Sequence, residues 1–484
     1  MEFEIQDGVL LKCRLNIGET EVVIPEGVKS IGDRAFYQNQ LLESITIQEG
    51  VTSIGKEAFT ECRSLQSITL PESVTSIGEK AFSYCSSLQS ITLPESVTSI
   101  GERAFAYCSR LQSITIPESV TQIGAEAFLW CRRLQSINIP DNIRSIAQGL
   151  FTGCESLRHI HLPEQLESIE KMAFDCCSSI ESIVIPKRIQ CIEKSTFLSC
   201  SRLKSIIIPE NITRIRWTAF YECKSLESIT IPETVRSIDY GAFAYCEKLR
   251  ISVAPNHPYF IVDDDVLFDK KQERLIMYPC GKQEAHYRIP DGVIKIGDMA
   301  FYSCEKLESV TIPESVTGIG AEAFAYCSSL QSITIPDSVM HIGKDAFHFY
   351  QSLQSIVFRG FVIPTDQYDL NLLHKDMPKL REMLRTEDYE KDIPAAVKIP
   401  ALLTEYRKHP SPKLADWIRK NASEVLSFLI KDVSGAATAA VLQIENLPLP
   451  RQEIEKAAAL AVLHTQNGGN PEIQMLLLRY LDMH

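Results

Sequence analysis

A phenylalanine recurs at a fixed spacing along most of this 484-residue chain. It falls every 23 residues through the first ten copies and returns after one interruption, at Phe36, Phe59, Phe82, Phe105, Phe128, Phe151, Phe174, Phe197, Phe220, Phe243, Phe301, Phe324 and Phe347. A repeat of about 20 to 50 residues is typical of solenoids, in which each unit contacts only its neighbours. The repeat therefore predicts thirteen stacked coils up to about residue 360.

The repeat around Phe82 shows what one coil contains. The run LQSITL, residues 88–93, alternates with the period of a strand, and Pro94 ends this strand because proline lacks a backbone N–H. The run SVTSIG before Phe82 predicts a second short strand, and EKAFSYC predicts one or two helical turns. One coil buries too little apolar surface to fold alone, so coils are expected to be stable only when stacked.

Eleven of the fifteen cysteines occupy one position of the repeat, three residues after the phenylalanine. They are Cys62, Cys85, Cys108, Cys131, Cys154, Cys177, Cys200, Cys223, Cys246, Cys304 and Cys327. An odd total with one cysteine per coil does not fit pairing into disulfides, and a residue at a fixed place in the coil belongs to the packing. The sequence predicts free, buried thiols. No CxxC pair is present, and we expect no metal site.

The pattern LxxIxIPxxVTxIGxxAFxxCxxL resembles the repeat of the BspA-like leucine-rich repeat family over approximately residues 1 to 360. The resemblance implies an α/β leucine-rich repeat solenoid. It has a parallel β-sheet on the concave side and short helices or turns on the convex side. The resemblance also implies a protein-binding role. Members described as adhesins are bacterial surface proteins that usually carry export signals or anchors.

Two segments of the array depart from the repeat. Residues 1–25 predict an N-terminal β-hairpin cap, and the insertion at about 255–290 matches them, with FIVDDDVL beside FEIQDGVL. We interpret the insertion as a second cap fused into the array. Its Asp263, Asp264 and Asp265 are interpreted as a solvated turn; a calcium site is the alternative, without the glycine and spaced oxygen ligands of an EF-hand loop.

Residues 361–484 lose the repeat and predict a small all-α C-terminal domain. Segments such as PALLTEYRKH and SEVLSFLIKD carry apolar residues at i, i+3 and i+4, with Pro, Gly and Asn between segments. These short helices resemble α-hairpins of the ankyrin kind, although no TPLHxA signature appears. Two roles stay open for this domain: covering the open end of the solenoid, or acting as a second binding module.

Composition and motifs exclude several classes of function. A formal charge of −13 and a pI near 5.4 argue against nucleic acid or an anionic membrane as partner. No apolar run approaches the roughly 20 residues of a membrane span. The start MEFEIQDGVLLKC has no basic, apolar leader, so we expect a cytoplasmic location; a cell-surface or secreted location is the alternative if the sequence is a trimmed piece. Phosphate-loop, HExxH, nucleophile-elbow and dinucleotide motifs are missing, so we expect no enzyme, catalytic residue, cofactor or small-molecule substrate.

In each coil, the predicted strand that corresponds to LQSITL has two outward positions, which lie two and four residues after the repeat leucine. Most coils carry hydroxyl side chains there, such as Ser90 and Thr92. The sixth to eighth coils instead carry His159, His161, Val184 and Ile207, flanked by Arg158, Glu181 and Lys204. In coils six to ten the glycine of SIG is also replaced, by Ala147, Glu170, Glu193, Arg216 and Asp239.

We interpret these seven flanking and outward residues as a binding site for a protein partner, with Val184 and Ile207 as its apolar centre. The alternative is that the middle copies are older and the outer copies recently duplicated. A metal site at His159 and His161 lacks a visible third ligand. The predicted function is a non-enzymatic protein-binding scaffold whose partner is unidentified. The alternative is a bacterial cell-surface adhesin or host-interaction protein whose export route is not visible.

Overall fold

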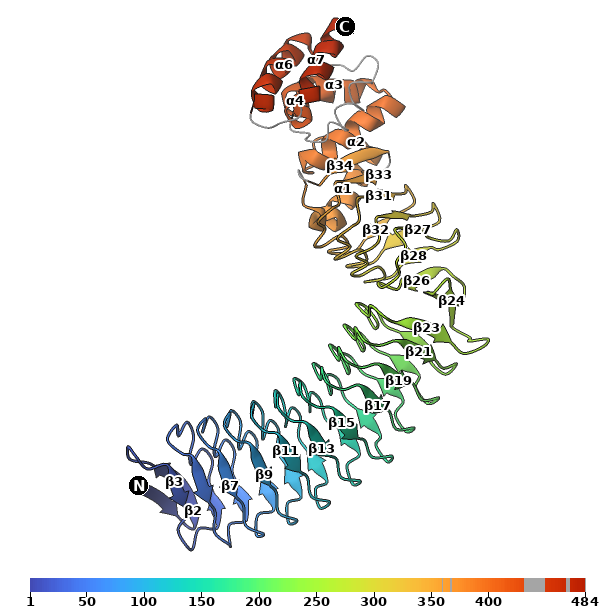
Figure 1. Ribbon diagram of the computed structural model, residues 1–484. Helices are drawn as coiled ribbons and strands as arrows, with labels where there is room; N and C mark the ends of the chain where they lie inside the picture. The colour runs from blue at the N-terminus through green and yellow to red at the C-terminus, as the bar shows by residue number, and fades with distance from the viewer. Residues whose placement is uncertain (359, 366–367, 431–448, 467–470, 484) are drawn as a thin grey trace. The chain divides into compact units, whose positions relative to one another are not determined.

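The predicted leucine-rich repeat solenoid, followed by helices, is confirmed. The computed structural model describes residues 1–358, 360–365, 368–430, 449–466 and 471–483. The chain forms two compact units, Met1–Lys270 with Met277–Gly281, and Lys271–Ile276 with Lys282–His484. Figure 1 shows the stacked coils of the first unit in blue to green, and the strands and helices of the second unit in yellow to red.

The first unit begins with an antiparallel hairpin of β1 (Glu2–Gln6) and β2 (Val9–Arg14). Left-handed backbone at Asp7 (φ 50°) and Gly8 (φ 81°) forms its turn. β2 also pairs in parallel with β4 (Ser30–Ile31), a strand of the first coil, so the hairpin covers that coil.

Each coil from that of β3 and β4 to that of β21 and β22 contributes one strand to each of two faces, and β23 adds one more strand to the first face. The first face contains β3 (Glu21–Val23), β5 (Ser44–Thr46), β7 (Ser67–Thr69), β9 (Ser90–Thr92), β11 (Ser113–Thr115), β13 (Ser136–Asn138), β15 (His159–His161), β17 (Ser182–Val184), β19 (Ser205–Ile207), β21 (Ser228–Ile231) and β23 (Arg250–Val253). The second face contains β4 (Ser30–Ile31), β6 (Ser53–Ile54), β8 (Ser76–Ile77), β10 (Ser99–Ile100), β12 (Gln122–Ile123), β14 (Ser145–Ile146), β16 (Ser168–Ile169), β18 (Cys191–Ile192), β20 (Arg214–Ile215) and β22 (Ser237–Ile238). Paired strands are parallel, and the constant repeat places equivalent residues opposite each other, as Ile91 opposite Ile114.

The segment around the repeat phenylalanine is a run of turns, and the predicted helical turn was wrong. The residues two before and two after Phe82 adopt left-handed backbone, with φ 55° at Lys80 and φ 60° at Tyr84. A left-handed residue cannot continue a right-handed helix. The backbone instead bonds to the next coil, where the Phe82 N–H donates to the Ala104 carbonyl at 2.7 Å.

The phenylalanine side chains form a continuous stack in the core of the first unit. From Phe36 to Phe243, ring centroids of successive coils lie 4.9 to 5.9 Å apart, and the rings are close to parallel. All of these rings are buried. The spacing matches offset-stacked aromatic pairs, so each coil is held to its neighbours by its largest side chain.

The prediction of free, buried thiols is confirmed. None of the fifteen cysteines forms a disulfide, and all eleven repeat cysteines are buried. The Cys85 thiol donates to the carbonyl oxygen of Phe59 at 3.1 Å, and the Cys108 thiol donates to that of Phe82 at 3.2 Å. Cysteine therefore does more than fill a small space in the core, because its S–H also satisfies a buried carbonyl of the preceding coil.

A hairpin of β24 (Phe260–Asp263) and β25 (Val266–Asp269) interrupts the array. Asp264 and Asp265 form its turn, with φ of 48° and 63°. Both residues are exposed, as expected of a solvated turn.

The second unit resumes the two-faced coil. One face contains β26 (Arg274–Met277), β28 (Lys295–Ile296), β30 (Gly318–Ile319) and β32 (His341–Ile342). The other contains β27 (His286–Arg288), β29 (Ser309–Thr311), β31 (Ser332–Ile335), β33 (Ser355–Phe358) and β34 (Phe361–Pro364). β34 runs antiparallel to β33 and ends this sheet.

Helices follow the last strand, as predicted for the C-terminal region. A 3-10 turn, η1 (Leu370–Leu372), leads into α1 (Leu373–Thr386), α2 (Ala395–Lys408), α3 (Pro412–Lys420), α4 (Ala422–Ile430), α6 (Arg451–Gln466) and α7 (Pro471–Met483). α1 contacts β32 and α2 contacts β34, so the first two long helices cover the end of the array. The ankyrin-like arrangement stays a prediction. Among the described residues, no helix has both the length and the apolar character needed to cross a membrane.

Candidate functional site

The outward side chains of the first-face strands, which are the odd-numbered strands from β5 to β21, form what we call the Ser/Thr face. In β7, β9 and β11 the first and third residues are exposed and the central isoleucine is buried. Side chains alternate across a strand, so the two outward positions per coil are those that the sequence indicated. Most of them carry hydroxyl groups, which makes the outer part of this face uniform.

Two aliphatic side chains replace hydroxyls in the middle of the Ser/Thr face. Val184 ends β17 and Ile207 ends β19, and the two residues are register partners on paired strands. Neighbouring strands lie about 4.8 Å apart, so the two side chains are adjacent. Val184 is 73% exposed and Ile207 is 78% exposed. Solvent therefore contacts most of both side chains.

Two imidazoles lie on the neighbouring coil. His159 and His161 are the first and third residues of β15, and both are exposed. They lie opposite Ser136 and Asn138 of β13. Within the part of the chain that the structure describes, no group of three His, Cys, Asp or Glu side chains could hold a metal ion. The imidazoles offer hydrogen-bonding groups beside the aliphatic pair.

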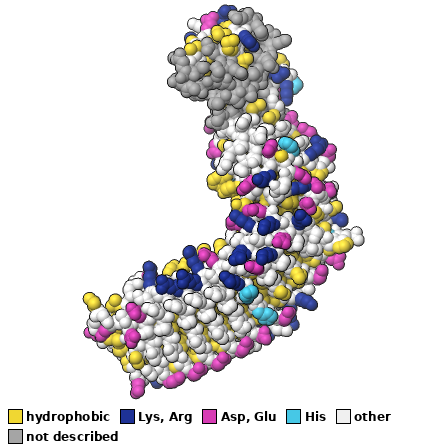
Figure 2. All heavy atoms as spheres, in the orientation of Figure 1, with side chains coloured by type: hydrophobic (Ala, Val, Ile, Leu, Met, Phe, Trp, Pro, Cys, Tyr) yellow, Lys and Arg dark blue, Asp and Glu magenta, His cyan; other side chains and the backbone are white. Residues whose placement is uncertain are grey.

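Charged side chains line the edge of this patch where the strands begin. The Lys204 ammonium donates to Glu181 Oε2 at 2.8 Å, and Arg202 Nη2 lies 3.5 Å from Glu181 Oε1. The hydrogen bond from Lys204 lowers the pKa of Glu181, and the positive charges of Lys204, Arg202 and Arg158 act in the same direction. Figure 2 shows Lys and Arg side chains close to histidine side chains on the first unit. Arg202 was not among the predicted site residues.

The structure thus brings the seven predicted residues onto three adjacent coils of one face. We call the set His159, His161, Val184, Ile207, Arg158, Glu181 and Lys204 the middle patch. Its members are all exposed. Whether they bind a partner stays a prediction.

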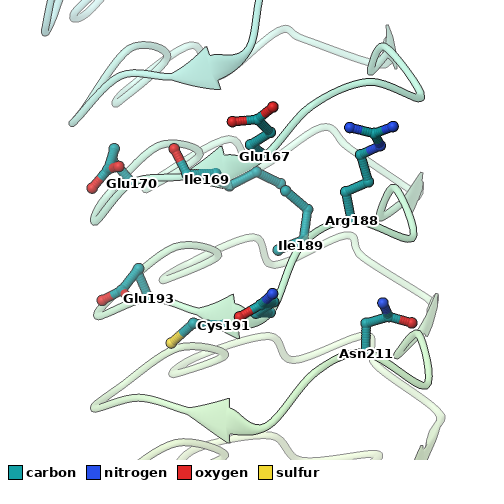
Figure 3. A pocket seen from close by; sticks show the side chains of 10 residues that line it. Glu167, Ile169, Glu170, Arg188, Ile189, Cys191, Glu193 and Asn211 are labelled. Carbon is teal, nitrogen blue, oxygen red and sulfur yellow. The ribbon is translucent and has the colours of Figure 1, made fainter.

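A pocket of about 570 Å³ lies on the second face of the same coils. Its lining includes Glu167, Glu170, Arg188, Cys191, Glu193 and Asn211. Figure 3 shows Glu170, Glu193 and Cys191 toward one side of the pocket, and Arg188 and Asn211 toward the other. Sequence reasoning missed this pocket, although Glu170 and Glu193 occupy the glycine position whose replacement it had noted. That replacement was the available signal.

Comparison with known proteins supports the repeat assignment. The chain matches the family model described as BspA type Leucine rich repeat region (6 copies) at residues 4–135, 121–250 and 278–368. No curated protein matches the chain.

Several solved structures are similar. A leucine-rich repeat protein from Bacteroides ovatus ATCC 8483 is 32% identical, with 74% of this chain and 87% of that chain covered and a TM-score of 0.50. A leucine-rich repeat protein from T. pallidum is 30% identical over 37% of this chain and 87% of that chain, with a TM-score of 0.35. A leucine rich cell surface protein from Faecalibacterium prausnitzii A2-165 is 28% identical over 73% and 86%, with a TM-score of 0.39. The family model covers more than half of the sequence, and this chain belongs to the BspA type leucine-rich repeat family.

Proposed function

We propose that this chain is a non-enzymatic scaffold that binds a protein partner through its Ser/Thr face, with the middle patch supplying selectivity. The observation that carries the proposal is the exposed, adjacent pair Val184 and Ile207. An exposed apolar centre with a polar rim is the usual composition of a protein interaction site. Repeat arrays also present extended surfaces that suit protein partners.

The aliphatic pair is large enough to affect affinity measurably. Full burial of a Val or Ile side chain contributes about 1.5 to 3 kcal/mol. Because each side chain is about three-quarters exposed, covering both contributes about 2 to 4 kcal/mol. That range corresponds to a change of about 30-fold to 700-fold in Kd.

The charges of the patch indicate the kind of partner. Three positively charged groups, Arg158, Arg202 and Lys204, act on the carboxylate of Glu181 at this edge. A partner that presents an apolar side chain flanked by acidic residues complements this arrangement. The charged edge is exposed, so it contributes mainly to the association rate, and salt is expected to slow association. The net charge of −13 gives nucleic acid no comparable attraction to the chain as a whole.

The test begins with affinity capture and mass spectrometry to identify a partner, followed by measurement of its Kd. The double variant Val184→Thr with Ile207→Thr restores the residue that most outer coils carry, so the coils are expected to fold normally. We expect the Kd to rise at least about 30-fold. The matched control is Thr98→Ser with Thr121→Ser, two exposed positions of earlier coils that lie outside the Ser/Thr face, which is expected to leave the Kd unchanged. An unchanged Kd in the Thr double variant would remove the patch from the proposal.

We also propose a cytoplasmic location. The repeat thiols act as hydrogen-bond donors in the core, and a donor thiol must stay reduced, which suits a reducing compartment. Fractionation of native cells with an antibody to the chain tests this proposal. Recovery at the cell surface would favour the adhesin alternative instead.

A further inference from the structure

Both strand ladders of the first unit stop at the same junction between two coils. On the Ser/Thr face one sheet ends at β15 and the next includes β17 at its edge; on the second face one sheet ends at β16 and the next begins at β18. β15 and β16 belong to one coil, and β17 and β18 belong to the next. We call this junction the seam. The chain is described throughout residues 1–281, and there the seam has strand pairing on neither face.

From the coil of β3 and β4 to the coil of β21 and β22, every other junction between neighbouring coils keeps strand pairing on at least one face. β7 and β9 lie in different sheets, but β8 and β10 of the same coils pair. β12 and β14 lie in different sheets, but β11 and β13 pair. The junctions immediately before and after the seam keep both ladders. The seam is therefore the weakest of these coil interfaces in backbone hydrogen bonding.

Single backbone groups show the same difference. At the preceding junction the Glu170 N–H donates to the Ile146 carbonyl at 2.9 Å, and at the following junction the Arg216 N–H donates to the Ile192 carbonyl at 2.9 Å. The corresponding N–H at the seam belongs to Glu193. It makes no such bond to the preceding coil within this fully described unit.

The pocket on the second face lies over the seam, between Glu170 and Glu193 (Figure 3). In outer coils this position has no room for a side chain, because a Cβ on Gly101 would lie 2.6 Å from the backbone nitrogen of Glu79. Glu170 and Glu193 occupy this position in the two coils that flank the seam. Arg216 keeps its ladder, so loss of the glycine permits the gap but does not by itself create it.

The turn side and the core still hold the seam together. The Phe174 N–H donates to the Thr196 carbonyl at 2.9 Å, and the Cys200 thiol donates to the Phe174 carbonyl at 3.2 Å. The rings of Phe174 and Phe197 stack with centroids 5.6 Å apart. The chain is therefore continuous in its core across the seam, while the two faces on either side are not bonded.

We propose that the seam divides the first unit into two cooperative blocks, one ending with the coil of β15 and β16 and the other beginning with the coil of β17 and β18. The stability of a repeat array is a sum of coil stabilities and nearest-neighbour interfaces, so the array opens first at its weakest internal interface. Opening there exposes the facing ends of both blocks while each block stays folded. This behaviour belongs to the chain alone and needs no partner.

Three equivalent amides test the proposal in the full, unmodified chain. The N–H groups of Phe151, Phe174 and Phe197 each donate to a backbone carbonyl of the next coil at 2.9 Å. Only the bond of Phe174 crosses the seam. Hydrogen exchange with single-residue resolution is measured over a range of urea concentrations below the unfolding transition. We expect the Phe174 amide to exchange at least about tenfold faster than the other two, and its exchange to accelerate with urea because opening exposes surface.

Two results would overturn the proposal. Exchange rates of the three amides within about threefold of each other would mean that the seam is as strong as its neighbours. A fast Phe174 amide whose rate does not respond to urea would indicate a local fluctuation that exposes little surface, and not the separation of two blocks.

Discussion

The buried thiols make the stability of the solenoid sensitive to alkaline pH. Burial raises the pKa of Cys62 and of Cys108 from near 9 to about 12. A thiol whose pKa is raised on folding contributes stability that is present below pH 9 and is lost as the pH rises from 9 to 12, because the unfolded chain ionises first. Between pH 8 and pH 10 each of these two thiols loses about 1.4 kcal/mol of stabilisation.

The double variant Cys62→Ala with Cys108→Ala isolates this contribution. The two residues lie two coils apart, so their effects are expected to add, to about 3 kcal/mol. Urea unfolding is followed by far-UV circular dichroism at pH 8, 9 and 10 under a reducing agent. The variant starts less stable, because it lacks the thiol volume and its hydrogen bond, but the gap to the unmodified protein should narrow by about 3 kcal/mol by pH 10. Other ionising groups are common to both proteins and cancel. A gap that stays constant with pH would refute the reasoning.

Two further predictions concern the backbone. Gly101→Ala should destabilise the protein by about 1 to 3 kcal/mol, because its Cβ would meet backbone atoms of the preceding coil at 2.6 Å, whereas Ala147→Gly at the same repeat position should change stability by no more than about 1 kcal/mol. Equal effects in urea unfolding would contradict this. Gln38→Gly should stabilise by about 0.5 to 1 kcal/mol, because the exposed Gln38 has left-handed backbone at φ 58°. The control Gln66→Gly, an exposed position without left-handed backbone, should destabilise, and a loss of stability in Gln38→Gly would show that the left-handed backbone costs little.

Much of the fold could be predicted because the repeat constrains every coil in the same way. The spacing of phenylalanine and cysteine indicated stacked coils with free thiols, and both predictions are confirmed by the ring stack and by bonds such as that from Cys85 to Phe59. Alternation in the strand indicated which side chains point outward. These features depend on residue type at a fixed interval, which the sequence displays directly.

The turn segment was mispredicted because its conformation depends on contacts with the next coil. EKAFSYC contains good helix formers, and local propensity favours a helix there. In the array, Lys80 and Tyr84 instead adopt left-handed backbone, and the Phe82 N–H bonds across to Ala104. Hydrogen bonds between coils outweigh the local preference, and a single repeat read in isolation contains no sign of them.

The candidate site was predictable in part for the same reason. The outward positions of the middle patch followed from alternation, but Arg202 joins Glu181 from a turn whose direction the pattern does not specify. The pocket and the seam depend on how closely two coils approach. The replaced glycine indicated that the approach had changed, but Glu193 and Arg216 carry the same kind of change and only Glu193 lies at a broken ladder.

The position of the seam bears on the two interpretations of the middle coils. Drift in older copies, limited only by folding, is expected to keep the interfaces that hold the array together. The middle coils do keep the core, since Phe174, Phe197 and Cys200 are buried like their counterparts. They nevertheless carry exposed aliphatic side chains on one face and an acidic pocket on the other, and they lack both ladders at one junction. Departures from structural rules that gather in one place, with the core intact, are typical of functional sites.

The middle patch extends across the seam, with His161 before it and Val184 after it, so a partner that contacts both residues would hold the two blocks together. The proposed weakness of this junction and the proposed binding on its face would then share one location in the chain, which favours selection over drift.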